Sequence, residues 1–309
     1  EPKALRNIPG YASEINTAYF ANNRQYVFSG VFEHQFKKKP SFRYRLQGTY
    51  KRGANATTPN YRLNNTGSEE KNFSITAGWK KEKFNTELFY SHFATKVGIF
   101  IGSHIGNLTD LQNAIAAPKP NEVFLGQNTN KIQRPYQDVT HDLLKSKTSF
   151  YTGESKFTVL LAWQFNHRKE FDIVRSSTNK NPQLDLSIHT ISEDISWDHP
   201  RKNNFSGIAG IVLMQQNNSY KGRYFIPNYF AYNFGGYYIG KWSKHKWELQ
   251  AGFRFDNKNI NTTRLKYNSD TINYDFNFST LASSFNAVYK PTDNWRLNTN
   301  ISLTSRGPF

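Results

Sequence analysis

Cysteine is absent from the 309 residues, and methionine occurs only once. The chain therefore has neither disulfides nor thiolate metal sites. Long hydrophobic runs are missing too. The longest, residues 159–163 and 211–214, are far shorter than the roughly 20 residues that a membrane helix needs. This composition excludes a helical membrane protein. It does not exclude a membrane β-barrel, in which only alternate strand residues meet lipid.

Positive charge is in excess, with 40 lysines and arginines against 23 acidic residues and a net charge of +17. Dense positive charge is one sign of nucleic-acid binding. Here the basic residues are scattered over turns, strands and loops. A hydrated sheet face with lysines at the turns accounts for that scatter better. We expect no nucleic-acid partner, although a soluble basic β protein that binds nucleic acid or polysaccharide stays an alternative.

Aromatic residues make up 16 % of the chain, and this favours strands. Residues 42–51, 157–166, 247–256 and 295–303 alternate apolar with polar side chains, as strands with two different faces do. The polar face carries charges of both signs, which a dry core would not tolerate unpaired. Water on that face is the simpler explanation. The pattern predicts thirteen strands, over residues 13–20, 25–36, 41–51, 72–80, 84–95, 138–152, 156–167, 186–197, 204–216, 231–242, 246–256, 275–290 and 295–305.

Short turns alternate with long loops along these strands. The short turns are expected near residues 37–40, 81–83, 153–156, 198–203, 244–246 and 291–294, and the long loops over 52–71, 96–137, 168–185, 217–230 and 257–274. Five of the six tryptophans, at positions 79, 197, 242, 247 and 295, stand beside short turns. A membrane barrel has short periplasmic turns, long outer loops and aromatic belts at both interfaces. We therefore expect an all-β fold, a transmembrane antiparallel up-and-down barrel.

The longest predicted loop contains a short helical pattern. We expect a helix over Thr109–Ala117, because Thr109 or Asn107 can cap its beginning and Pro118 follows its end.

An ordered series of short motifs runs through the chain. It includes Gly-Ser-His-Ile-Gly-Asn-Leu-Thr-Asp-Leu at 102–111, Arg-Pro-Tyr-Gln-Asp-Val at 134–139 and Ile-Pro-Asn-Tyr at 226–229. Residues 22–24, 46–49, 97–99, 141–145 and 165–172 complete it. The series resembles the barrel of TonB-dependent outer-membrane receptors of the Bacteroidetes type, and the resemblance covers nearly the whole chain.

The resemblance implies a plug domain that precedes a barrel of roughly 22 strands. Thirteen strands are then an incomplete barrel. Residues 1–12 are expected to be the plug-to-barrel junction and residues 13–309 a partial barrel. The chain starts at Glu1 without a signal sequence and stops as abruptly at Phe309. We therefore expect the plug, the TonB-contacting segment and the closing strands to belong to a longer protein.

The resemblance also implies a function. It is the active import of a scarce ligand, most often an iron chelate such as a siderophore or haem, across the outer membrane of a Gram-negative bacterium. The implied partners are outer-membrane lipid, the plug, the TonB–ExbB–ExbD complex and the small-molecule ligand. Loops and plug bind the ligand, and the inner-membrane complex drives plug rearrangement. No cofactor is expected.

Two sets of candidate residues follow. Aromatic and basic loop residues are candidates for ligand binding, because a ligand lands first on the external loops: His104, Arg134, Tyr136, Arg223 and Tyr224. His104 has an alternative role in fixing local loop structure. Basic residues on the polar strand face are candidates for contact with the plug: Arg43, Arg45, Lys51, Arg254 and Arg296. Pairing with wall carboxylates such as Glu248 and Asp256 is the alternative for this set.

The sequence gives little support for a metal site or for catalysis. His167, Glu170 and Asp172 are the nearest approach to a ligand set, but His167 and Glu170 should face opposite sides of a strand. No nucleophile motif or phosphate-binding loop occurs, so we predict that the chain is not an enzyme. A passive porin or another self-contained outer-membrane barrel is the main rival to the receptor, and an upstream plug would separate the two.

Overall fold

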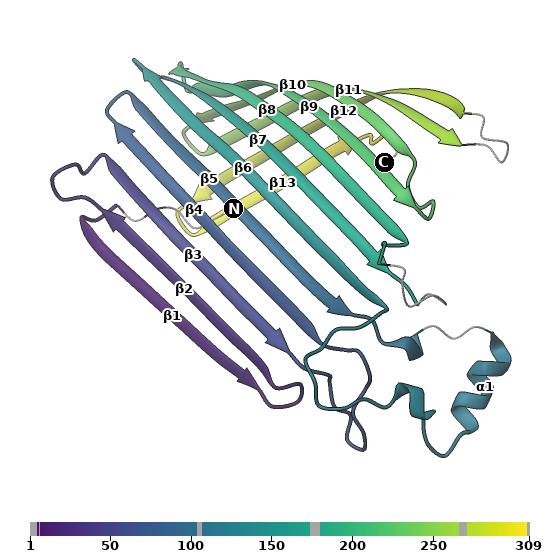
Figure 1. Cartoon of the computed structure of the whole chain (residues 1–309). Coiled ribbons are helices and arrows are strands. Elements are labelled where there is room, and N and C mark those ends of the chain that lie inside the picture. The colour runs from purple at the N-terminus through teal and green to yellow at the C-terminus, as the bar shows by residue number, and fades with distance from the viewer. Residues whose placement is uncertain (1–4, 6, 104–106, 174–179, 266–270, 308–309) are drawn as a thin grey trace.

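The computed structural model describes the whole chain except residues 1–4, 6, 104–106, 174–179, 266–270 and 308–309. Its described residues form one antiparallel sheet of thirteen strands, and each strand pairs with its neighbours in the sequence (Figure 1). The strands are β1 (Gly10–Phe20), β2 (Gln25–Gln35), β3 (Phe42–Gly53), β4 (Ser68–Lys81), β5 (Phe84–Gly98), β6 (Tyr136–Thr152), β7 (Ser155–Phe171), β8 (Leu184–Lys202), β9 (Phe205–Gly222), β10 (Asn228–Lys244), β11 (Trp247–Leu265), β12 (Thr271–Thr292) and β13 (Trp295–Thr304). The predicted all-β, up-and-down fold is confirmed.

The helix predicted in the longest loop is α1 (Leu108–Ala116). Of the two proposed caps, Asn107 takes the role, because its side chain accepts a hydrogen bond of 2.9 Å from the backbone N–H of Asp110. Two 3₁₀ turns flank the helix, Ile101–Ser103 and Glu122–Phe124. Among the residues that the structure describes, no helix has the length and apolarity to cross a membrane.

The strands reach further toward the loop end than the sequence pattern indicated. The predicted loop 217–230 shrinks to residues 223–227, and the predicted loop 168–185 to residues 172–183. Much of the predicted loop 257–274 is strand as well, because β11 continues to Leu265 and β12 begins at Thr271. In the extensions of β11 and β12, Asn and Thr occupy most of the convex side, where the strand cores carry apolar residues. Their backbones nevertheless continue the hydrogen-bonded ladder.

Short turns and long connections lie at opposite ends of the sheet. All six predicted short turns join strands at one end, and five of them have two residues, at 82–83, 153–154, 203–204, 245–246 and 293–294. Asn203 and Asn204 both have positive φ, 51° and 67°, as a two-residue turn of the favoured twist requires. The irregular segments 54–67 and 99–135 lie at the other end with α1 (Figure 1). One connection there, between β1 and β2, is also short.

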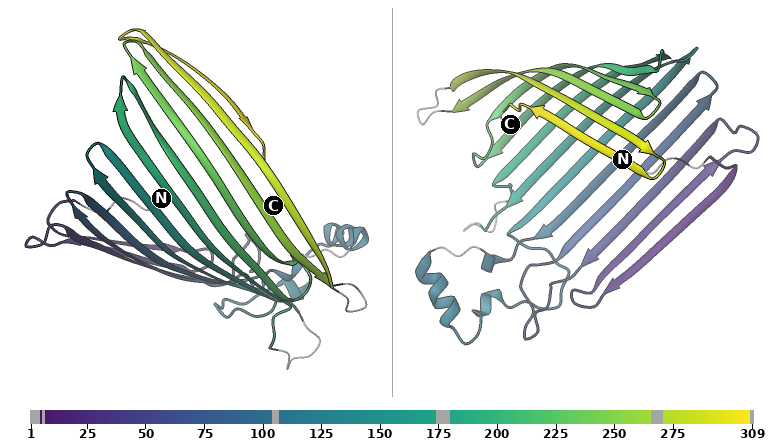
Figure 2. Two further views of the ribbon diagram at one scale, coloured as in Figure 1. Left: turned by 90° about the horizontal axis from the view of Figure 1, so that it is seen from above. Right: turned by 180° about the vertical axis from the view of Figure 1, so that it is seen from behind.

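The sheet curves into an open trough and does not close on itself, so β1 and β13 are its edges (Figure 2). Its two faces differ in polarity. Apart from glycines, the buried residues of the described strands lie on the face that carries Arg45, and they are Gln35, Arg45, Thr76, Ser149, Leu184, Leu186, Asn218, Ala231 and Val288. Curvature crowds side chains on a concave face and spreads them on a convex one. The crowded, largely polar face is therefore the concave one, and rings such as Phe73, Phe253 and Trp247 stand exposed on the convex face.

Candidate functional site

All five predicted plug-facing residues lie on the concave face, and four of them contact partners within the sheet or in the segment before β1. Arg45 forms an ion pair with Glu33 of β2, and its side chain is only 8 % exposed. Lys51 Nζ lies 2.8 Å from Glu70 Oε1 of β4. These pairs join neighbouring strands, so wall carboxylates already neutralise both cations.

Arg254 makes a two-pronged contact with Asp256 on the same strand. The Arg254 Nε and Nη2 donors lie 2.5 and 2.7 Å from the two carboxylate oxygens. Asn233 of β10 donates to the same carboxylate at 3.3 Å. Gly235 leaves the space for it, since a Cβ there would lie 2.2 Å from Asp256 Oδ1. The pairing with Asp256, which the sequence offered as the alternative for this arginine, is present.

Arg43 faces the segment that leads into β1. Its Nη1 lies 3.5 Å from the carbonyl oxygen of Leu5 and 3.4 Å from Asn7 Oδ1. Leu5 is 6 % exposed and fills the space above Gly78, where a Cβ would lie 2.7 Å from its Cδ1. The chain therefore enters the sheet across the concave face. Arg296 lies on the edge strand β13, and its position in the register places it on the concave face as well. Contact of these residues with a plug stays a prediction.

The two long segments at the loop end pack as one unit around buried asparagines. Asn65 is 3 % exposed, and its Nδ2 donates to the carbonyl oxygens of Ile99 at 3.1 Å and Pro135 at 2.6 Å. Its Oδ1 accepts from the N–H of Gln133 at 2.9 Å. Asn55 is 1 % exposed and joins the same two segments through a 3.1 Å bond from its Nδ2 to the carbonyl oxygen of Gln127. Sequence reasoning missed both residues, because single asparagines in an asparagine-rich chain carry no signal.

Two of the predicted ligand residues are part of a four-membered stack. The rings of Tyr136 and Phe171 stack at 4.3 Å, Lys96 Nζ lies 4.1 Å above the Tyr136 ring, and the Arg134 guanidinium lies 5.2 Å from the Phe171 ring. Arg134 also donates to the backbone oxygens of Asp172 and Asn181. Tyr136 stands on the convex face, paired with Phe171, so the sheet turns its ring away from the concave side.

The other predicted ligand residues lie nearby. Arg223 forms an ion pair with the carboxylate of Asp172, which ties the loop after β9 to the loop after β7. Tyr224 is 51 % exposed and contacts Tyr220 edge-on at 5.6 Å. His104 lies outside the described residues. The structure thus gathers Arg134, Tyr136 and Arg223 around the β6–β9 loop end, and their role in ligand binding stays a prediction.

A concave-face cavity of about 550 Å³ lies at the loop end of β9–β12, partly in segments predicted as loop and partly at the ends of predicted strands. We call it the mouth cavity. It is lined by Gln216, Ile226, Pro227, Tyr229, Ala231, Lys258, Ile260, Thr262, Phe276 and Phe278. Its volume falls within the range of small-molecule sites, about 300–1,000 Å³.

The chemistry of the mouth cavity is mostly apolar with a few fixed polar groups. The rings of Phe276 and Phe278 lie parallel at 6.2 Å. The Tyr229 hydroxyl donates to Gln216 Oε1 at 2.7 Å, and Lys258 supplies a cation. Here the usual polarity of the sheet is inverted, since the convex side of β11 carries Asn257, Asn259 and Asn261. Sequence reasoning missed the cavity because more than half of its lining comes from segments predicted as loop, 217–230 and 257–274, to which no sheet face was assigned.

His167 and Glu170 lie on opposite faces of β7, as the sequence predicted. His167 Nε2 lies 2.7 Å from Asp185 Oδ1 on the convex face, whereas Glu170 pairs with Arg168 on the concave face. Within the described ranges, no three His, Asp or Glu side chains converge as a metal ligand set would. His167 instead makes a hydrogen bond between β7 and β8 near the loop end of its strand.

No family model matches the sequence. No curated protein sequence matches it either. Solved structures do match: the ferric yersiniabactin uptake receptor FyuA from Yersinia pestis (TM-score 0.69, 12 % identity) and the ferric-catecholate import receptor Fiu from E. coli K12 (0.72, 11 %). The siderophore receptor PiuA from Acinetobacter baumannii is similar to the same degree (0.69, 12 %). The alignments cover 96, 99 and 96 % of this chain but only 47, 56 and 49 % of the three receptors, so the chain spans about half their length. It has the fold of part of such a receptor barrel.

Proposed function

We propose that this chain is part of a TonB-dependent receptor that imports an iron chelate across the outer membrane of a Gram-negative bacterium. The observation that carries the proposal is the distribution of polar and apolar side chains over the two faces of the curved sheet. Its convex face is apolar and exposed and its concave face is polar and crowded, as in a barrel with lipid outside and water inside. The fold shared with receptors for iron chelates supports the same function.

The Bacteroidetes type belongs to this proposal and rests on the sequence motifs alone. So do the plug, its contact with the concave-face arginines and the TonB–ExbB–ExbD complex as the source of energy. The ligand is proposed to be a siderophore or haem. Its first contacts would be the predicted loop residues and the mouth cavity, which lies at the loop end on the water-filled side of the sheet.

The test of this function uses a deletion strain and its complement. Cells are starved of iron and supplied with ⁵⁵Fe as a tris-catecholate chelate, a hydroxamate chelate or haem. We expect uptake of at least one of these in the complemented strain only, and its loss when TonB is removed. Uptake that continues without TonB would indicate a passive porin, and uptake of none of the three would remove iron as the cargo.

The mouth cavity gives a sharper prediction. Replacing Phe276 and Phe278 by alanine removes the two parallel rings from the cavity, and aromatic contacts of this kind contribute roughly 0.5–1.5 kcal/mol beyond their burial. We expect the concentration of chelate at half-maximal uptake to rise about tenfold, which corresponds to 1.4 kcal/mol. The matched control is Phe253→Ala on the convex face. Equal effects of the two changes would contradict a role for the cavity.

A further inference from the structure

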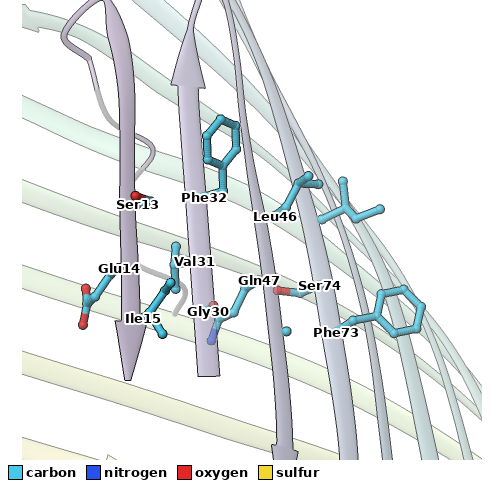
Figure 3. Close-up of a pocket in the computed structure, with 12 residues that line it drawn as sticks. Ser13, Glu14, Ile15, Gly30, Val31, Phe32, Leu46, Gln47, Phe73 and Ser74 are labelled. Carbon is cyan, nitrogen blue, oxygen red and sulfur yellow. The ribbon is translucent and has the colours of Figure 1, made fainter. Parts of the chain in front are cut away.

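A shallow apolar groove crosses the convex face of β1–β4. Two adjoining recesses of about 500 and 750 Å³ form it, and they share Ile15, Gly30, Gly48 and Phe73. These four residues lie directly opposite one another on successive strands. Figure 3 shows the apolar side chains of Phe32, Leu46 and Phe73 around the part of the groove near Gly30. The two glycines are therefore the floor of the groove, between Ile15 and Phe73.

Nothing in the backbone requires glycine at these two positions. Neither Gly30 nor Gly48 has a positive φ. A Cβ at Gly30 would meet no atom within 4 Å, and one at Gly48 would meet only the carbonyl oxygen of Asn72, at 4.0 Å. Glycine inside a strand costs roughly 0.5–1 kcal/mol relative to alanine. What the two glycines provide is the empty space of the groove.

Positive charge gathers at the loop end of this groove. Lys71 lines it directly. Glu69, two residues away on the same face, has Arg52 opposite it on β3 and Lys96 opposite it on β5. Lys71 and Arg52 both pair with this single carboxylate, and their side chains are 65 and 42 % exposed. Three cations thus surround one acid, and the Nε of Arg52, 3.8 Å from Glu69 Oε2, makes no hydrogen bond within the part of the chain that the structure describes.

This excess is local to the groove. The row of opposed residues continues across the convex face with alternating sign, as Asp138 on β6, Lys169 on β7, Asp185 on β8 and Lys221 on β9. In that part of the row each acid has a cation on either side. Glu69 of β4 also has a cation on either side, Arg52 and Lys96, but it has Lys71 on its own strand as a third.

The number of residues from the short-turn end places the cations where lipid headgroups would begin, if this face meets a membrane. Trp79 and Phe42 mark the short-turn end of the convex face, and Glu69 and Arg52 each follow ten positions away along the strand. A tilted strand crosses the hydrocarbon layer in about 9–11 residues. A groove that accepts an acyl chain therefore ends at a cluster that attracts phosphate.

We propose that the convex face of β1–β4 binds one phosphorylated glycolipid of the outer leaflet. Arg52, Lys71 and Lys96 hold its phosphates, and the groove over Gly30 and Gly48 holds an acyl chain. The inference rests on the proposed function only in requiring that this face meets the outer membrane. It assigns to the chain a lipid site that is separate from the mouth cavity.

The test measures lipid retained by the intact protein after extraction in mild detergent, by native mass spectrometry. The probes are diphosphoryl lipid A and its dephosphorylated form. We expect the wild type to retain the diphosphoryl form, and Arg52→Gln with Lys71→Gln to lower its affinity about tenfold. Gly48→Leu or Gly30→Leu should do the same by filling the groove.

The controls are Gly236→Leu, on the convex face with the same free space, and Lys147→Gln, opposite Glu87 on the concave face. Both should retain lipid as the wild type does. Retention by the groove and charge variants at wild-type level would overturn the proposal, as would equal binding of dephosphorylated lipid A. Iron uptake by the same variants should be unchanged. If the protein binds lipid A but imports no chelate, the proposed function is wrong and the lipid site is still supported.

Discussion

Single buried asparagines, rather than apolar side chains, hold the loop end together. Asn65 has a positive φ of 54°, a backbone conformation that asparagine tolerates better than most residues. Its amide meets three backbone groups of the segment 99–135. A long irregular segment must satisfy its backbone polar groups somewhere, and here two asparagine side chains satisfy several of them.

Asn65→Ala should therefore loosen the packing between the two long segments. Removing the amide leaves buried backbone groups unpaired, at a cost of about 1–3 kcal/mol for each. We expect faster hydrogen exchange at the Gln133 amide and faster trypsin cleavage after Lys131. Asn64→Ala is the matched control, since the Asn64 side chain makes one 3.3 Å hydrogen bond. Indistinguishable exchange in the two variants would contradict the role given to Asn65.

At the scale of the element, the sequence placed the strands correctly but placed their loop-side ends too early. Alternation of apolar and polar residues identifies a strand where one face meets lipid or core. Toward the loop end, β11 and β12 continue with Asn257, Asn261 and Asp275 on their convex side, and their apolar side chains line the mouth cavity instead. Side chains there bond across the strands, as from Asn261 Nδ2 to Asp275 Oδ1 at 2.6 Å. The backbone hydrogen-bond ladder continues through this region, although the apolar positions of β12 change from the convex face (Leu281, Phe285) to the concave face (Phe276, Phe278).

Asp172→Asn tests how the loops after β7 and β9 are joined. The change removes the charge that Arg223 meets, and the pair is exposed, with side chains 58 and 34 % accessible. Exposed pairs contribute at most about 1 kcal/mol and weaken with salt. We expect faster trypsin cleavage after Arg223 at low salt and no difference at high salt. Asp138→Asn serves as the control, and a salt-independent effect would show that the ion pair is not the cause.

At the scale of the whole molecule, the sheet has two open edges. Within the described residues β1 pairs only with β2, and β13 only with β12. An unpaired edge presents free N–H and C=O groups to any other chain. The largest rings of the convex face add an exposed apolar surface, so the 309 residues by themselves leave both backbone and side chains uncovered.

We expect residues 1–309, produced alone in detergent, to form dimers and larger species through these edges, and to import nothing. Size-exclusion chromatography with light scattering measures the first, and the ⁵⁵Fe uptake assay the second. The intact protein should be a single discrete species in the same detergent. A monodisperse monomer of residues 1–309, or uptake by it, would show that the trough closes or functions without further strands.

The sequence determined the strand number, the two faces of the strands with clear alternation (42–51, 157–166, 247–256 and 295–303) and the end at which the short turns lie. These depend on local alternation and turn chemistry, which a single chain displays openly. Only the tertiary structure decided which residues meet. Arg134 and Tyr136, predicted as ligand contacts, are joined in a stack with Phe171 and Lys96. The mouth cavity and the glycine-floored groove each need four strands in register, and register between distant segments is a property of the folded sheet.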